Sequence, residues 1–154
     1  MSAPVLEVAR LPGSDPDVAL PADAAVFAAA VADWHVEDAG PSKIKKGAGG
    51  PPALRLSENP DILATVAQRT ADRPALVIGF AAETDDVIAH ATAKRQRKGC
   101  DWIVANDVSA ASGVMGGTEN AVTLIDEAGT DTWPRMTKDE VGRRLAARIA
   151  EHFA

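Results

Sequence analysis

Residues 75–109, ALVIGFAAETDDVIAHATAKRQRKGCDWIVANDVS, decide the fold, because a strand pattern, a helix pattern and a second strand pattern follow one another. The apolar run at 75–81 is typical of a strand that is buried on both faces of a parallel sheet. A second run of this type follows at 102–105. Two such strands joined by about fourteen helical residues predict a right-handed parallel crossover.

The helix between these strands has a start signal and a stop signal. Thr84 precedes Asp85 and Asp86, so a hydroxyl N-cap and two carboxylates lie where a helix leaves bare N–H groups and partial positive charge. Gly99 is suited to a left-handed stop. We expect the inward face of this helix to contain Val87, Ile88 and Ala91.

Four cations, Lys94, Arg95, Arg97 and Lys98, fill the last turn of the predicted helix. Their like-charge pairs cost about 0.2 to 0.5 kcal/mol each, and the helix C-terminus returns roughly 0.3 to 1 kcal/mol per cation. Because these effects nearly cancel, two interpretations stand side by side. The cations are either solvated caps of the helix, or Lys94 and Lys98, one turn apart on one face, both reach an anionic ligand.

The composition indicates a compact intracellular protein. The chain has 154 residues, of which 46% are hydrophobic, and such a length suffices for one domain without disulfides or metals. A net charge of −6 argues against general affinity for nucleic acid or anionic membranes. Cys100 is the only cysteine, so we expect a core thiol in a reducing cytoplasm. The longest apolar run, 24–32, is too short to span a bilayer.

The N-terminal third contains one predicted strand. Residues 1–21 are expected to be irregular, with a candidate edge strand at 5–8. The run 24–32 predicts a buried strand that ends at Asp33, although its alanines would equally allow a helix. Ligands of open α/β sheets bind beyond the carboxyl ends of strands. Asp33 is therefore a candidate for contacting a ligand hydroxyl, a base edge or a hydrated metal, although such an aspartate also serves simply to organise a turn.

Two further segments carry anion-binding signals. Lys43, Lys45 and Lys46 precede a glycine-rich tract, which predicts a basic loop that either closes over a polyphosphate or stays solvated. After a short strand at 53–57, the sequence Asn59-Pro60-Asp61 predicts a helix start, with the helix running to about Thr70. The N–H groups at such a start bind anions in some proteins and only begin a helix in others.

The C-terminal part predicts a hairpin and a helix. Strands at 121–125 and 130–134 flank the turn residues 127–129. Thr137 and Glu140 form a capping-box pattern that opens a helix to about Phe153, with Val141, Leu145 and Ile149 inward. Helix-like and strand-like runs alternate along the chain, which favours an α/β fold. The histidines, His35, His90 and His152, have no metal-ligand spacing.

Several motifs together resemble the C-terminal part of the phosphopantothenate–cysteine ligase family, also called phosphopantothenoylcysteine synthetases. The matching segments occur in the family's order over residues 22–154, which we take as one CTP-binding domain. They are AAAVADW at 28–34, KIKK at 43–46, ENPDIL at 58–63, GFAAET at 79–84, AKRQRKGCDWIVANDVS at 93–109, ENAVTLI at 119–125 and PRMTKDEVGRRL at 134–145.

The resemblance implies a Rossmann-like three-layer fold with a mainly parallel sheet and a C-terminal hairpin plus helix. It also implies a homodimer and a CTP-dependent ligase of coenzyme A biosynthesis that joins 4′-phosphopantothenate to cysteine. Lys43 is the implied catalytic flap lysine, and Lys45, Lys46 and Gly47 are implied flap residues. The implied nucleotide contacts are Phe27, Ala28, Ala29, Asp33, Lys43, Pro60, Asp61, Ile62, Leu63, Phe80, Lys94 and Lys98.

The implied cofactor is Mg²⁺, bridged by the phosphates of the co-substrate CTP, with Asp33 as the one candidate protein ligand and no flavin in this part. On this reading, Phe80, Lys94 and Lys98 form one wall of the nucleotide site. In many bacteria the family is fused behind a flavin-dependent decarboxylase, so fusion or association with such an enzyme is expected.

The family pattern begins with a glycine-rich segment that nothing in residues 1–21 matches. Because that segment carries an asparagine assigned to the acyl-cytidylate step, a catalytically inert nucleotide-binding module is an alternative. A different nucleotide-dependent ligase or transferase on the same fold and a structural dimerisation domain are two further alternatives.

Overall fold

The structure, a computed structural model, describes residues 20–29, 31–37, 53–109 and 117–154. They divide into two compact units, one made of residues 20–28 and 62–154 and the other spanning Ala29–Asp61. This division was not predicted, because no linker composition marks the points where the chain leaves and re-enters the larger unit. The candidate edge strand at 5–8 lies outside the described residues.

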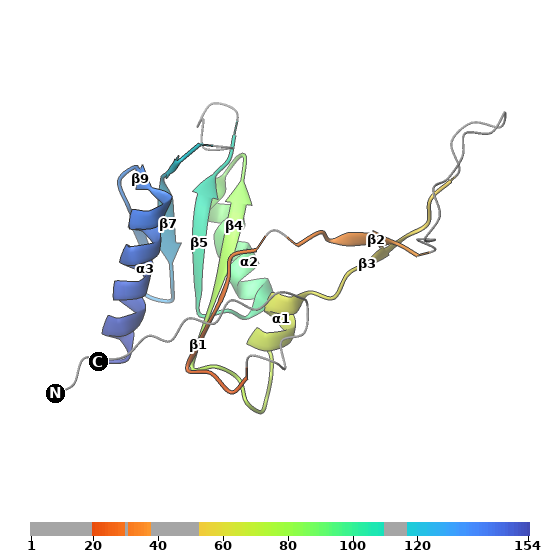
Figure 1. The fold of residues 1–154 in the computed structure, drawn as a ribbon, viewed down its shortest axis with the longest axis horizontal. Coiled ribbons are helices and arrows are strands. Elements are labelled where there is room, and N and C mark those ends of the chain that lie inside the picture. Colours follow the sequence, from red (N-terminus) through yellow and green to blue (C-terminus); the bar gives the residue numbers. More distant parts are fainter. Residues whose placement is uncertain (1–19, 30, 38–52, 110–116) are drawn as a thin grey trace. The chain divides into compact units, whose positions relative to one another are not determined.

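A five-stranded sheet forms the centre of the larger unit, in the order β1-β4-β5-β7-β8 (Figure 1). Strands β1, β4 and β5 are parallel to one another, and β7 and β8 continue the sheet as an antiparallel hairpin. The predicted α/β fold with a parallel core and a C-terminal hairpin is therefore confirmed. The strands are β1 (Ala24–Phe27), β4 (Leu76–Glu83), β5 (Trp102–Asp107), β7 (Val122–Ile125) and β8 (Thr130–Thr132).

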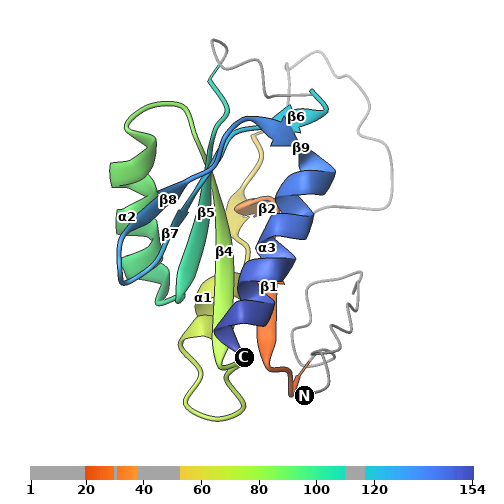
Figure 2. The same cartoon turned by 90° about the vertical axis from the view of Figure 1, so that its left-hand side faces the viewer.

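Helices cover both faces of this sheet, which gives three layers (Figure 2). Helix α3 (Lys138–His152) packs on one face, and α1 (Ile62–Ala67) and α2 (Val87–Lys98) pack on the other. Strand β4 supplies both cores because its side chains alternate. Leu76 and Ile78 belong to the α3 cluster, whereas Val77 and Ala81 belong to the cluster under α1 and α2.

The amino-terminal ends of β4 and β5 are joined by Asp101. Its carboxylate accepts the backbone N–H of Val77 at 2.7 Å, and both of its oxygens accept from one guanidinium nitrogen of Arg73, Nη2, at 3.0 and 3.1 Å. The Arg73 guanidinium also donates to the carbonyl of Ala67 at 2.7 Å. One ion pair therefore ties the end of α1, the start of β4 and the start of β5 together.

The start of α2 differs from the prediction at Thr84. Strand β4 continues to Glu83, so the helix begins only at Val87, after Asp86 in a left-handed conformation (φ 41°) and without a side-chain cap. The Thr84 hydroxyl instead donates to the Asp85 carboxylate at 3.1 Å. Ile88 is 41% exposed and does not belong to the inward face of the helix. That face contains Val87 and the buried Ala91.

The end of α2 and the second strand follow the sequence closely. Gly99 takes the expected left-handed conformation (φ 75°), and its N–H donates to the carbonyl of Arg95 at 2.9 Å. Cys100 is a buried core residue, as expected. Strand β5 runs two residues beyond the predicted end at Ala105, because it pairs with β4 as far as Glu83 and Asp107.

Strand β1 is shorter and less buried than predicted. It ends at Phe27 rather than at residue 32, and it pairs only with β4 among the described strands. Val26 is 45% exposed as a result. Helix α1 is also short, since it ends at Ala67 rather than near Thr70, and it buries Val66 and Ala67. An alanine-rich run is compatible with several structures, so composition did not define these ends.

The smaller unit contains an antiparallel two-stranded ribbon, β2 (Trp34–Val36) with β3 (Leu56–Glu58). The predicted strand at 53–57 therefore lies a few residues further along the chain. Trp34 and Val36 lie opposite Glu58 and Leu56. Because directly paired residues share a face, these four side chains form one face of the ribbon.

The C-terminal elements were predicted well. The turn of the β7–β8 hairpin contains Gly129 at φ 146°, in the region that favours glycine. A second small ribbon, β6 (Glu119–Asn120) with β9 (Met136–Thr137), was not predicted, because two-residue strands carry no periodicity. Helix α3 buries Val141, Leu145 and Ile149, all three as expected.

The capping box of α3 is complete. The Glu140 carboxylate accepts the N–H of Thr137 at 2.8 Å and its hydroxyl at 2.8 Å, and the N–H of Glu140 donates to the Thr137 hydroxyl at 3.2 Å. The backbone bond and then the hydroxyl bond from Thr137 lower the pKa of Glu140. A lowered pKa contributes stability above the unfolded-state value that is lost as pH falls through the folded-state value.

We therefore predict a pH-dependent effect of Glu140→Gln. At neutral pH the variant unfolds at a lower temperature than the wild type, because a neutral amide caps Thr137 less strongly than a carboxylate. The difference shrinks as pH falls through the lowered pKa of Glu140, where the wild-type carboxyl becomes neutral. Thermal unfolding between pH 7 and pH 3, about the range in which carboxyls titrate, measures it. The control is Glu127→Gln in an exposed turn, and a difference that stays constant with pH would contradict the prediction.

Candidate functional site

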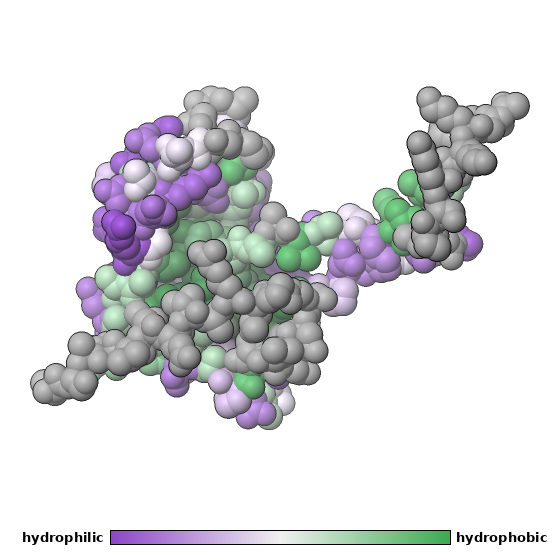
Figure 3. Space-filling model, in the orientation of Figure 1, coloured by the Kyte–Doolittle hydropathy of each residue, from purple (hydrophilic) through white to green (hydrophobic). Residues whose placement is uncertain are grey.

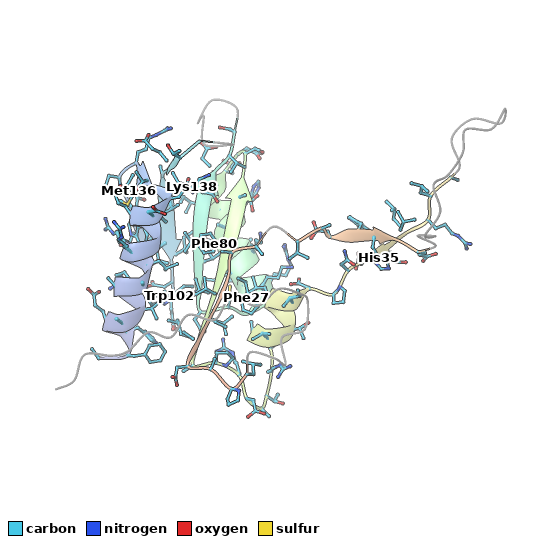
Figure 4. The ribbon with its side chains drawn as sticks, in the orientation of Figure 1. Phe27, His35, Phe80, Trp102, Met136 and Lys138 are labelled. Carbon is cyan, nitrogen blue, oxygen red and sulfur yellow. The ribbon has the colours of Figure 1, made fainter. Side chains whose placement is uncertain are left out.

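In the larger unit, several predicted nucleotide residues gather on the face that carries α1 and α2. Phe27, at the end of β1, and Leu63, in the first turn of α1, both pack partly buried against the core under these helices. Ile62 starts α1 and is also partly buried. Phe27 and Leu63 come from segments far apart in the sequence, and both pack against the core on one side of the sheet. Phe27 is labelled in Figure 4.

The helices α1 and α2 are neighbours and are tied at their C-terminal ends. The side-chain amide of Gln68, just after α1, donates to the backbone carbonyls of Arg97 and Lys98, at 3.4 Å each. The guanidinium of Arg95 donates to the carbonyl of Asp101 at 2.9 Å. The last turn of α2, which carries Lys98, is therefore fixed to α1 and to the start of β5.

The four cations of α2 differ in their surroundings. Arg95 donates to the backbone of Asp101, and Lys94 and Lys98 are partly buried residues one helical turn apart. Arg97 is exposed. Two ammonium groups on the α1–α2 side of the sheet suit an anion with several oxygens, because lysine acts as a compact donor to phosphate.

Phe80 lies on the opposite face of the sheet from these residues. Its side chain packs against the α3 cluster, since β4 alternates and the adjacent Gly79 and Ala81 occupy the other face. Phe80, Lys94 and Lys98 therefore do not share one continuous wall in the larger unit. The resemblance had grouped them, and strand alternation gives the physical reason for the difference.

The smaller unit brings Asp33 and Pro60 close together in space. Asn59 makes this connection, because its backbone N–H donates to the carbonyl of Asp33 at 2.8 Å and its side-chain amide donates to the carbonyl of Ala32 at 2.8 Å. Asp33, Pro60 and Asp61 thus lie at one end of the ribbon. The side chain of Asn59 holds this end instead of capping α1, which begins only at Ile62.

The remaining predicted site residues are either exposed or outside the described part of the chain. Ala28 and Ala29 follow β1 and are exposed. The flap residues Lys43, Lys45, Lys46 and Gly47 lie outside the described residues.

A cavity of about 400 Å³ lies at the amino-terminal ends of the parallel strands, and none of the predicted nucleotide residues lines it. Its walls include Arg95, Trp102 and Arg148, together with acidic residues such as Asp126 and Glu151. Each arginine already donates a hydrogen bond to a neighbouring backbone or carboxylate oxygen. Because none of the predicted nucleotide residues lines this cavity and several acidic side chains do, we do not assign the anionic nucleotide to it.

The described residues contain neither a reactive cysteine nor a cluster of side chains that would bind a metal ion. Burial raises the pKa of the Cys100 thiol, which therefore stays protonated and unreactive at neutral pH. In the described ranges, no group of three or more histidine, cysteine, aspartate or glutamate side chains is arranged to hold a metal ion. Hydrogen bonds from Ser109 lower the pKa of Asp107, which organises the turn after β5.

None of the helices described is long and apolar enough to cross a membrane.

The model of the DNA/pantothenate metabolism flavoprotein C-terminal domain matches residues 17–153. The chain belongs to this family. The match includes the crossover β4-α2-β5, both helical layers and the smaller unit.

Curated relatives of this flavoprotein C-terminal domain are named coenzyme A biosynthesis bifunctional protein CoaBC. Those of Vibrio cholerae and Escherichia coli K12 are each 39% identical, over 83% and 81% of this chain and 32% and 31% of their own lengths. The protein of Mycobacterium tuberculosis H37Rv is 46% identical over 56% of the chain and 23% of its own length. The chain thus spans about a third of the length of the first two relatives.

Solved structures of the family share the fold. The C-terminal domain of a CoaBC protein matches with a TM-score of 0.63 and 31% identity, over 85% of this chain and 55% of that one. A Cab2 mutant in complex with phosphopantothenate-cysteine matches with a TM-score of 0.54 at 18% identity, over 84% of this chain and 46% of that one. At that identity the likeness concerns the fold alone.

Sequence reasoning missed Gln68 and misread Asn59. Both act through side-chain amides that donate to backbone carbonyls of distant segments. A helix-start signal at Asn59 was visible, but its partner, the carbonyl of Ala32, is 27 residues away. For Gln68 the sequence contained no signal, because an exposed glutamine after a helix is common and its partners depend on how α1 packs beside α2.

Proposed function

We propose that this chain provides the CTP-dependent ligase part of coenzyme A biosynthesis, which joins 4′-phosphopantothenate to cysteine through an acyl-cytidylate. The family match over residues 17–153 is the observation that carries the proposal. The CoaBC name of the curated relatives agrees with this pathway. The proposal includes a cytoplasmic location, fusion or association with a flavin-dependent decarboxylase, and no flavin in this part.

The proposed reaction has two steps. A carboxylate oxygen of 4′-phosphopantothenate attacks the α-phosphorus of CTP, the bond to the bridging oxygen breaks, and pyrophosphate leaves. The cysteine amine then attacks the acyl carbonyl, loses a proton and displaces CMP, which forms the amide. Both nucleophiles are reactive without a strong base, so the site must mainly stabilise negative charge on phosphoryl and acyl oxygens.

The chain's lysines meet that requirement. Lys94 and Lys98 would hold the nucleotide from α2, and Lys43 would act at the reacting phosphate. The remaining proposed contacts from the larger unit are Phe27, Ala28, Ile62 and Leu63, and those from the smaller unit are Ala29, Asp33, Pro60 and Asp61. Phe80 is proposed as a separate contact from the other face of the sheet.

Magnesium fits this donor set through the phosphates. Mg²⁺ is commonly bound by one or two carboxylates together with substrate phosphates and water, rather than by an all-protein cage. When bound, it neutralises phosphate charge. Asp33, which is exposed in the smaller unit, is the proposed protein carboxylate that would bind Mg²⁺.

The first test of the proposal removes the α2 lysines. We predict that Lys94→Ala and Lys98→Ala each weaken Mg·CTP binding by roughly tenfold, because each deletes a charge-assisted contact worth about 1.5 kcal/mol or more. Titration calorimetry on the full chain measures the dissociation constant. Arg143→Ala on α3, which removes an exposed cation from the other face of the sheet, is the matched control. Equal effects of all three substitutions would indicate only a general loss of charge.

The second test concerns turnover and Lys43. With CTP, Mg²⁺ and 4′-phosphopantothenate, we predict pyrophosphate release by the wild type and at least about a hundredfold slower release by Lys43→Ala, the usual cost of losing one electrostatic stabiliser. CTP binding should change far less, because Lys43 is proposed to act in the transition state. Lys138→Ala is the control. Saturable CTP binding without any pyrophosphate release by the wild type would favour a nucleotide-binding module instead.

The proposal also includes a homodimer formed through the β2–β3 ribbon. Trp34 is 53% exposed and Leu56 is 55% exposed, and the strand register places both on the same face. The surface of this segment shows hydrophobic residues next to hydrophilic ones (Figure 3). The other face is polar, since Ser57 hydrogen-bonds to Glu37 there. An isolated two-stranded ribbon is marginally stable in water, so a second copy that covers the apolar face would stabilise it.

We predict that Trp34→Asp shifts the chain from dimer to monomer in sedimentation experiments. A buried tryptophan at an interface contributes roughly 2 kcal/mol or more to association, and a carboxylate in its place would be left without a partner. The control is His35→Asp, which puts the same charge on the opposite face. A wild type that sediments as a monomer at all concentrations would exclude the dimer.

A further inference from the structure

Gly79 lies in β4 next to two residues of the proposed nucleotide site, Phe27 in the neighbouring strand and Leu63 in α1. It is paired in register with Phe27 of β1 on one side and with Ile103 of β5 on the other. Across the α1–α2 face it meets Leu63. A Cβ atom at Gly79 would lie 2.6 Å from a Cδ atom of Leu63, closer than two carbon atoms approach in folded proteins. The absence of a side chain at Gly79 is therefore what lets Leu63 reach the strand.

The surroundings of Gly79 leave Leu63 little other space on the core side. A Cβ atom at Gly79 would also lie 3.6 Å from the sulfur of Cys100, which is itself buried. Val66, one turn further along α1, is 1% exposed, so the inner side of that helix is filled. A larger residue at position 79 would push the Leu63 side chain outward, toward the surface of the first turn of α1.

The C-terminal end of the same helix is fixed independently. The amide of Gln68 holds it to the carbonyls of Arg97 and Lys98, and the guanidinium of Arg73 holds the carbonyl of Ala67. With this end fixed, a displacement of Leu63 is confined to the amino-terminal turn of α1. Ile62 and Leu63, both proposed nucleotide contacts, lie in that turn.

We propose that Gly79 is a positioning residue for the nucleotide site, which acts by allowing Leu63 and the first turn of α1 to approach β4 closely. The inference rests on the proposed function, because the ligand whose site it shapes is the Mg·CTP of that proposal. Gly79 itself makes no contact with the ligand. Its effect passes through Leu63, and this separates a positioning role from a general structural one.

The test is a double-mutant cycle on CTP binding by the full chain. Gly79→Ala should weaken Mg·CTP binding by about tenfold, a moderate loss for a binding group displaced by part of an ångström. Its unfolding temperature should change little, because the atom it displaces is the end of a flexible side chain. In a Leu63→Ala background, where no Cδ atom remains to be displaced, adding Gly79→Ala should have no further effect on the dissociation constant.

The matched control is Gly142→Ala in α3, where a new Cβ atom would meet nothing within 4 Å. It makes the same chemical change away from α1, and CTP binding should be unaffected. If Gly79→Ala alone does not fold, the double variant relieves the clash and must bind CTP as Leu63→Ala does.

The possible results distinguish a failure of the positioning role of Gly79 from a failure of the proposed function. Unchanged CTP affinity in Gly79→Ala, or an equal loss in the wild-type and Leu63→Ala backgrounds, would overturn the positioning role while the proposed function stands. A wild type that binds no Mg·CTP would overturn the proposed function and this inference together.

Discussion

The structure depends on strand β4 being buried on both faces. Leu76, Val77 and Ile78 are each 0% exposed, and they alternate between the core under α3 and the core under α1 and α2. At roughly 25 cal/mol per Å² of buried apolar surface, a strand of this type stabilises both layers at once. The carboxylate of Asp101 fixes where β4 begins relative to β5, and so it sets the register of the parallel pair.

The two faces of the sheet are packed differently, and this difference positions the proposed site. The α3 face contains large side chains such as Trp102 and Trp133, whereas the α1–α2 face contains Gly79, Ala81 and Cys100. Small residues let a helix lie close to the strands, because the distance between layers follows the size of the side chains between them. The proposed lysines of α2 lie on the closely packed side.

An acidic protein can still hold an anion where its cations are concentrated. The net charge of −6 is an overall property, and screening over about 8 to 10 Å makes local charge decisive at a binding surface. In α2, Arg95 is bonded to the backbone of Asp101, and Lys94 and Lys98, one turn apart, are the lysines that we propose for nucleotide binding.

Local sequence patterns were sufficient to predict the crossover, the left-handed stop at Gly99, the β7–β8 hairpin and the capped α3, because hydrophobic period, glycine and capping residues act within a few positions of one another. Long-range packing instead sets that Phe80 faces α3, that Asn59 binds the carbonyl of Ala32 and that residues 29–61 form a separate unit. These outcomes depend on contacts between segments far apart in the chain, and local patterns contain no information about such partners.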